Sequence, residues 1–343
     1  MILKELNSAA LALAASAGWA AAEVPQVVTD IAPVHSLAAM VMGDLGAPDL
    51  VLPPGASPHG YAMRPSAARA LQEADLVFWV GEALTPWLAR PLTTLPDHGQ
   101  TVELMELPGV THLAFRQGAE LEVHHLPGQE EDHDHEEGHD HEDGHDHDDG
   151  HDEDHAEHDE HVVEPGHEGH VHEGLDPHGW LDPENARVWL TGMAEALAAA
   201  DPENAATYRA NAEAARADLA AQSARIAEEL AAAAPIRFLV YHDAYQYFEN
   251  RFDLTSAGAV TDSDATAPSA ARVAALRDKV SAAGVDCLFT EPQFGAGLAG
   301  SVFEESDGKL VEIDPLGSAL SAGPDLYPAL LEGMAKSFLT CKG

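Results

Sequence analysis

A long uninterrupted helical segment near the middle of the chain limits the possible folds more than any other feature. From Glu203 to Ala234 the sequence is rich in Ala, Glu and Arg and contains neither proline nor glycine. About 32 residues with a rise of about 1.5 Å each form a helix about 48 Å long. Asp201-Pro202 precedes this segment as a helix-start signal, and Pro235 ends it. Because this length exceeds one small domain, we expect residues 201–234 to link two domains.

Short apolar runs alternate with helical patterns before the long helix. Pro33 is expected to open one helix and Ser66 to cap a second. Asp182-Pro183 is the start signal of a third helix. The expected strands cover residues 26–31, 49–52, 75–80 and 101–104. This βαβα order predicts a parallel sheet.

A second series of the same kind follows the long helix. Its clearest helices are expected at Ser269–Ala283 and Tyr327–Leu339, with Cys341 just beyond the end of the latter. The expected strands cover residues 237–241, 254–260, 286–290 and 309–313. The pattern therefore predicts an α/β protein of two lobes, residues 23–200 and 235–343, each with a parallel sheet flanked by helices and joined by the long helix.

The first 22 residues have the pattern of a secretory signal peptide. Lys4 precedes the short apolar run Ala9–Ala17, and Ala20-Ala21-Ala22 fits a small-residue cleavage site before Glu23. The run is too short to span a bilayer, and no other segment approaches the roughly 20 apolar residues that a spanning helix needs. We therefore expect an exported protein without a membrane span.

A tract saturated with histidine and acidic residues runs from His124 to His172. Between Glu130 and Glu160 it contains no Lys or Arg, and its repeated HDH and GHDH units have no apolar period. Such a segment buries too little apolar surface to offset its ordering entropy, so we interpret it as a disordered loop with many weak metal sites. The net charge of −42 argues against nucleic acid and anionic membranes as partners.

Three isolated histidines stand where ligands collect in α/β proteins. His59 follows a predicted strand, His242 ends another, and His178 directly precedes a helix start. Ligands gather outside the carboxyl ends of parallel strands, so a site between the lobes could unite the three rings. Three imidazoles suit Zn²⁺, with Zn–N distances of about 2.0–2.1 Å. They also suit copper or nickel.

The fourth metal ligand is left open by the sequence. Asp314 is a candidate because it also ends a predicted strand, and water is an equal one. Glu291 is a third candidate, although it could instead hold the N–H of a ligating imidazole. Among the remaining histidines outside the tract, we interpret His35 as structural and the pair His98 and His112 as surface residues.

The chain has two cysteines, Cys287 and Cys341. An even number of cysteines in an exported chain suggests one disulfide bond. The two residues are far apart in sequence and form no CxxC motif, which argues against a thiol-based metal or redox site.

Several motifs together resemble one known family. They are PGASPHGYAMRPS, PHGWLDPENA, VYHDAYQYFE, TEPQF and EIDPLG, combined with the histidine tract, the long helix and the two cysteines. Over nearly the whole mature length, the chain resembles the ZnuA group of zinc-specific periplasmic binding proteins of bacterial ABC importers. Some members carry an acidic residue directly before the first histidine, where this chain has Pro58.

The resemblance implies how such a chain works. It implies two lobes on one rigid helix, a zinc ion between them held by His59, His178 and His242, and a Cys287–Cys341 disulfide. The histidine tract is a hallmark of the zinc branch. The implied function is capture of Zn²⁺ in the periplasm and delivery, by what we expect to be a monomer, to an ABC permease and its ATPase.

Two other functions are compatible with the same residues. A metal buffer, chaperone or adhesin would use the same site without a transporter. A zinc hydrolase would need three histidines and a bound water, but the sequence has no HExxH motif and only Glu291 as an obvious general base. We therefore expect a receptor and not an enzyme.

Overall fold

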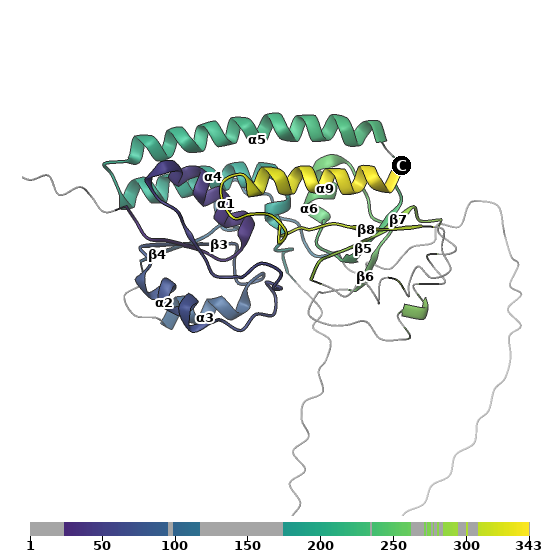
Figure 1. The fold of residues 1–343 in the computed structure, drawn as a ribbon, viewed down its shortest axis with the longest axis horizontal. Helices are drawn as coiled ribbons and strands as arrows, with labels where there is room; N and C mark the ends of the chain where they lie inside the picture. The colour runs from purple at the N-terminus through teal and green to yellow at the C-terminus, as the bar shows by residue number, and fades with distance from the viewer. Residues whose placement is uncertain are drawn as a thin grey trace, which may run out of the picture.

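The computed structural model describes residues 24–94, 99–116, 174–233, 235–261, 284–293 and 308–342, together with positions 271, 273–275, 277, 280 and 300. The predicted signal peptide, the histidine tract, His98 and most of the predicted helix Ser269–Ala283 lie outside the described residues. The described chain forms two lobes, each with a four-stranded parallel sheet (Figure 1). Among these residues, no helix is both long and apolar enough to cross a membrane.

The first lobe confirms the predicted parallel sheet, with strand order β2-β1-β3-β4. Its strands are β1 (Val27–Thr29), β2 (Asp49–Leu50), β3 (Leu76–Trp79) and β4 (Gln100–Glu103). Its helices are α1 (Ala32–Met42), the short turn η1 (Gly43–Leu45), α2 (Pro65–Glu73), α3 (Pro86–Thr94) and α4 (Pro183–Ala200).

The helix starts of this lobe show which local signals were reliable. Pro33 lies in the first turn of α1, and Asp182 caps α4 by accepting the Glu184 backbone N–H, both as predicted. The predicted Ser66 cap is wrong, because α2 begins one residue earlier at Pro65. Proline suits the first helical position, where its missing N–H costs nothing.

The second lobe repeats the arrangement, with strand order β6-β5-β7-β8. Its strands are β5 (Phe238–His242), β6 (Ala259–Thr261), β7 (Cys287–Thr290) and β8 (Lys309–Glu312). Its helices include α6 (Gln246–Phe252) and α9 (Leu326–Lys342). The strand predicted from Leu254 begins only at Ala259, because Asp253 ends α6 in the left-handed conformation and a loop follows.

The predicted disulfide bond is confirmed. Cys287 at the start of β7 and Cys341 in α9 are bonded, with their Cα atoms 5.7 Å apart. Cys341 lies inside the last helix and not beyond it, because α9 continues past the predicted end at Leu339. The bond fastens the C-terminal helix to the second sheet.

The long helix α5 (Ala205–Ala233) runs across both lobes (Figure 1). It packs against α1 and α4 of the first lobe and against α6 and α9 of the second. It starts later than the sequence predicts, because the Asp201 carboxylate binds the Asn204 side chain at 2.7 Å and the Tyr208 hydroxyl at 2.9 Å, which closes a turn between α4 and α5. Its 29 residues span about 44 Å.

One hydrophobic core extends through both lobes. The same buried cluster includes Trp189 of α4, Leu219 of α5, Phe238 of β5 and Phe338 of α9. The helices therefore form a shared layer on which both sheets rest (Figure 1). The division of the chain at residues 200 and 234 stays a prediction, because this core does not stop at either point.

Candidate metal centre

The three isolated histidines converge between the two lobes. His59 lies on the loop between β2 and α2, His178 precedes the short turn η2 (Gly179–Leu181), and His242 ends β5. The ring centroids are 5.3 Å apart for His59 and His178, 5.4 Å for His178 and His242, and 6.3 Å for His59 and His242. One nitrogen of each ring lies within 4.8 Å of the other two. The structure thus unites all three sequence-predicted histidines.

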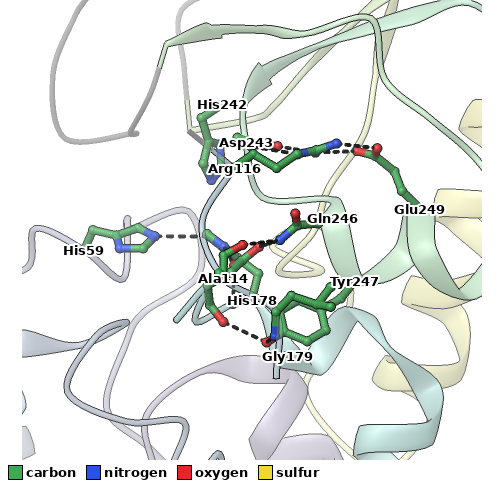
Figure 2. Close-up of polar contacts among 12 residues, drawn as sticks. His59, Ala114, Arg116, His178, Gly179, His242, Asp243, Gln246, Tyr247 and Glu249 are labelled. Atoms are coloured by element: carbon green, nitrogen blue, oxygen red, sulfur yellow. Dashed lines mark hydrogen bonds and ion pairs between the residues drawn. The ribbon is translucent and has the colours of Figure 1, made fainter. Parts of the chain in front are cut away.

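The distance between the first two rings suits a zinc ion. The Nε2 atoms of His59 and His178 lie 3.3 Å apart (Figure 2). Two nitrogens bound to tetrahedral zinc at about 2.0–2.1 Å would be separated by about 3.3–3.4 Å. His178 and His242 are buried, whereas His59 is half-buried and forms the outer side of the group.

Two buried carboxylates orient two of the rings. The Nδ1 atom of His178 lies 2.7 Å from Asp176 Oδ1, and the Nδ1 atom of His242 lies 2.7 Å from Glu291 Oε1. Since a carboxylate only accepts, we assign the proton of each ring to Nδ1, which directs the Nε2 lone pair toward a metal. Carboxylates that bind the far nitrogen are typical partners of metal-bound histidine.

Strand register brings His242 and Glu291 together. β5 and β7 are parallel neighbours, with Val240 opposite Phe289. Two residues further along, His242 ends one strand and Glu291 directly follows the other. The pair therefore meets at the carboxyl edge of the second sheet, where the sequence predicted a site.

The loop that carries His59 is held on both sides of the histidine. The Trp87 indole N–H donates to the Pro58 carbonyl at 2.6 Å, and the Tyr61 ring packs edge-on against Trp87 at 5.1 Å. The His59 backbone N–H donates to Ser57 Oγ at 3.2 Å. Pro58 cannot supply a carboxylate here, but its carbonyl anchors the loop.

The segment around His178 is hydrogen-bonded to the second lobe. The Trp180 ring packs against His178 with centroids 5.3 Å apart, and its N–H donates to the Pro315 carbonyl at 2.7 Å. The Tyr247 hydroxyl of α6 donates to the Asp176 carbonyl at 3.0 Å. His178 is thus fixed relative to His242 by contacts that cross between the lobes.

Asp314 lies in a turn that uses both of its carboxylate oxygens. Oδ1 accepts the Leu316 N–H at 3.2 Å, and Oδ2 accepts the Ser318 hydroxyl at 2.9 Å and the Ala319 N–H at 3.2 Å. The group of converging ligand atoms in the described chain consists of the three histidines and includes neither Asp314 nor Glu291. Asp314 as a ligand stays a prediction, and Glu291 occupies the position of a carboxylate that holds an imidazole.

Electrostatics match the group to a cation. Three neutral imidazoles and the carboxylates of Asp176 and Glu291 carry two negative charges, which a divalent ion balances. Burial, assisted by the negative charge of Glu291, raises the pKa of Tyr245 well above its ordinary value, so this phenol stays neutral beside the site.

The other described histidines lie outside this group. His35 is buried, its Nε2 lies 3.0 Å from the Pro48 carbonyl, and burial lowers its pKa. His112 is exposed, with its Nε2 2.7 Å from the Met105 carbonyl. The sequence did not single out Asp176, although its place two residues before His178 is the spacing of a side chain that folds back on the following backbone.

Comparison with known proteins assigns the chain to a group. The model of the family described as "Zinc-uptake complex component A periplasmic" matches residues 27–341. A high-affinity zinc uptake system protein ZnuA of Paracoccus denitrificans is 45% identical, with 98% of this chain and 99% of that protein covered. The protein of the same name from Brucella abortus (strain 2308) is 41% identical, with 99% of each chain covered.

Solved structures share the fold. A structure described as "Crystal structure of ZnuA" superimposes with a TM-score of 0.69 and 19% sequence identity. The superposition covers 93% of this chain and 100% of that chain. This similarity confirms the predicted two-lobed α/β architecture.

Proposed function

Because the chain belongs to the ZnuA family of periplasmic zinc-uptake components, we propose that it captures Zn²⁺ and delivers it to a membrane permease driven by a cytoplasmic ATPase. Members of this family are solute-binding receptors, so the chain is a zinc receptor and not an enzyme. The observation that carries the proposal is the convergence of three imidazole nitrogens within 4.8 Å of one another.

The zinc ligands in this proposal are the Nε2 atoms of His59, His178 and His242. Imidazole is a favoured zinc ligand, and three such ligands leave one tetrahedral position. We assign that position to water in preference to Asp314, because three hydrogen bonds within its own turn already engage the Asp314 carboxylate. An exchangeable fourth ligand suits a receptor, which has to release its ion.

The predicted signal peptide and the disulfide bond both support a periplasmic location. Cleavage of the predicted signal peptide after Ala22 would release the mature chain into the periplasm. The Cys287–Cys341 bond is of the kind that persists in an oxidising compartment. We propose that the mature protein acts as a monomer, with its core complete within one chain.

The histidine tract has the role of an accessory collector in this scheme. The described segments that flank it are paired with each other, because Ala114 and Leu175 form an antiparallel bridge. Asp176, which holds His178, directly follows this bridge. The described residues that flank the tract therefore lie near the metal centre, and in this proposal ions bound to the tract are passed to the three histidines.

Zinc titration of the metal-free mature protein tests the proposed site. We expect one tight site in the wild type and its loss in His178→Ala. Loss of a ligand should lower the zinc affinity by more than the roughly 10–100-fold typical of losing a residue that only orients a ligand. His112→Ala is the matched control, since His112 is exposed and lies outside the centre. Tight binding that survives in His178→Ala would overturn the assignment.

Transport separates the proposal from a buffer or adhesin. Deletion of the gene should slow uptake of radioactive zinc by intact cells at limiting zinc, and the wild-type gene should restore it. The His178→Ala gene should fail to restore uptake. Normal zinc uptake in the deletion strain would favour a buffer or adhesin over a receptor for import.

A further inference from the structure

A single arginine of the first lobe is inserted between two carboxylates of the second lobe. Arg116 lies at the end of the described segment that follows β4, and it points between Asp243 and Glu249 (Figure 2). Its Nε donates to Asp243 Oδ2 at 2.9 Å, its Nη1 to Glu249 Oε2 at 2.8 Å, and its Nη2 to Glu249 Oε1 at 2.9 Å. Its Nη2 also donates to Asp243 Oδ1.

Both carboxylates need the positive charge of this arginine, because they are shielded from water. The side chain of Glu249 is 3% exposed and that of Asp243 is 11% exposed. Arg116 binds each of them with two parallel N–H donors, a geometry that lysine cannot reproduce. The Ser256 backbone N–H supplies one further bond to Glu249, at 3.0 Å. The contact is therefore specific in geometry as well as in charge.

The contacts of Arg116 connect the backbone segments that carry two proposed zinc ligands, His178 and His242. Asp243 directly follows His242, so the arginine fixes the turn that leads from β5 into α6. On its other side, the Phe115 N–H donates to the Gly174 carbonyl at 3.2 Å, which ties Arg116 to the segment that carries Asp176 and His178. Arg116 is therefore linked to His242 through Asp243, and to the segment that carries His178 through the Phe115–Gly174 hydrogen bond.

Gln246 makes further contacts between the same two segments. Its side-chain N–H donates to the Ala114 carbonyl at 2.9 Å and to Asp176 Oδ2 at 3.3 Å. Asp176 is the residue that holds the His178 ring. Gln246, the first residue of α6, is therefore hydrogen-bonded both to the segment before Arg116 and to the carboxylate beside His178.

We infer that Arg116 is a positioning residue that sets the spacing of His178 and His242 for zinc. This inference rests on the proposed function, because it concerns the same metal centre. It predicts a change in zinc affinity on removal of Arg116 that is opposite to the change expected from charge alone. Removing a positive charge near a bound cation should tighten binding by Coulomb's law, whereas loss of the contact should loosen the spacing of the rings and weaken it.

The test is competition titration of zinc against a chromophoric chelator in the full mature protein. We expect Arg116→Ala to weaken zinc binding about tenfold, at the lower end of the range for residues that orient metal ligands. Arg116→Lys, which keeps the charge but loses the paired donors, should also weaken it. Bound Co²⁺ should show a changed visible spectrum in both variants, because d–d absorption reports the coordination geometry.

Two further variants separate positioning from a general loss of stability. Arg116→Ala leaves both Asp243 and the more deeply buried Glu249 without a positive partner. Arg116→Ala/Glu249→Gln should therefore recover part of the lost stability but keep the weakened zinc affinity. Arg225→Ala is the control, because Arg225 forms an exposed ion pair with Glu332 at 2.6 Å, between α5 and α9. It should bind zinc like the wild type.

The outcomes are distinct. Unchanged or tighter zinc binding in Arg116→Ala overturns the inference, and so does recovery of affinity together with stability in the double variant. His178→Ala, measured in the same series, reports on the proposed site itself. If His178→Ala abolishes binding while Arg116→Ala does not weaken it, the site stands and only the positioning role fails.

Discussion

Buried carboxylates at the carboxyl ends of the strands serve different purposes in this molecule. Glu291, after β7, binds an imidazole and faces the proposed zinc site. Asp30, after β1, instead accepts the backbone N–H groups of Ile31 and Val80, both at 2.8 Å. Burial outweighs these hydrogen bonds and raises the pKa of Asp30 from 3.8 to about 7. Asp30 is therefore most favourable to folding in its protonated form.

The raised pKa of Asp30 predicts a specific pH dependence of stability. Because the folded-state pKa lies above the unfolded one, its contribution is complete below about pH 4 and is lost as the pH rises through about 7. In metal-free protein, the unfolding free energy of the wild type minus that of Asp30→Asn should fall by roughly 4 kcal/mol over this range, at about 1.4 kcal/mol per pKa unit.

Denaturant titrations from pH 4 to pH 8 measure this difference. The subtraction cancels the contributions of the histidines and the other acidic residues, which both proteins share. Loss of one backbone hydrogen bond in Asp30→Asn adds a constant of about 1 kcal/mol and does not change the slope. A difference that stays constant with pH would contradict the prediction.

At the scale of the elements, sequence predicted the order of strands and helices but not all of their ends. All eight described strands fall within or overlap predicted segments. The central strands β1, β3, β5 and β7 are short, largely buried apolar runs, as is usual for parallel strands covered on both faces. The misplaced ends lie at turns such as Asp201 and Asp253, where one side-chain contact or one left-handed residue decides the boundary.

The candidate site was predictable to the extent that it depends on topology. The three histidines stand beside strand ends or a helix start, and parallel sheets collect such positions at one edge. Arg116 could not be found in this way, because its partners Asp243 and Glu249 lie 127 and 133 residues away in the sequence. Only the packing of one lobe against the other brings them together.

The disulfide bond should stabilise the C-terminal helix without affecting zinc binding. Cys287 and Cys341 enclose a loop with a sequence separation of 54, for which the chain-entropy model gives about 4 kcal/mol. We expect Cys287→Ala/Cys341→Ala to lose about that much unfolding free energy in urea titrations. Zinc stoichiometry should remain that of the wild type, because the bond joins β7 to α9 and not to the ligand loops. An unchanged urea midpoint would argue that α9 needs no cross-link.

At the scale of the molecule, the shared helical layer limits how the lobes can move. Trp180 of the first lobe donates to the Pro315 carbonyl, and the Tyr327 hydroxyl donates to the Trp180 carbonyl at 2.6 Å. Both contacts lie beside the metal centre and within a core common to the two lobes. We therefore expect movement of the half-buried His59 loop to open the site at a lower free-energy cost than separation of the lobes.

The roles proposed for the metal centre and the histidine tract predict two classes of zinc site. Removing the tract should leave the tight site intact, because all three histidines lie outside the residues removed. Arg116 and Gly174 can be joined by a short Asn-Gly link, a sequence suited to tight hairpins, since the flanking segments are already paired at Ala114 and Leu175.

Calorimetric zinc titration of this shortened protein should show one tight site with an affinity within about twofold of the wild type, and loss of the weak sites. The matched control is the full-length chain with every tract histidine changed to serine, which keeps the acidic residues. If imidazoles supply the weak sites, as zinc prefers, this control should lose them as well. If the weak sites persist there, carboxylates hold them, and if the tight site disappears with the tract, the three histidines are not the primary site.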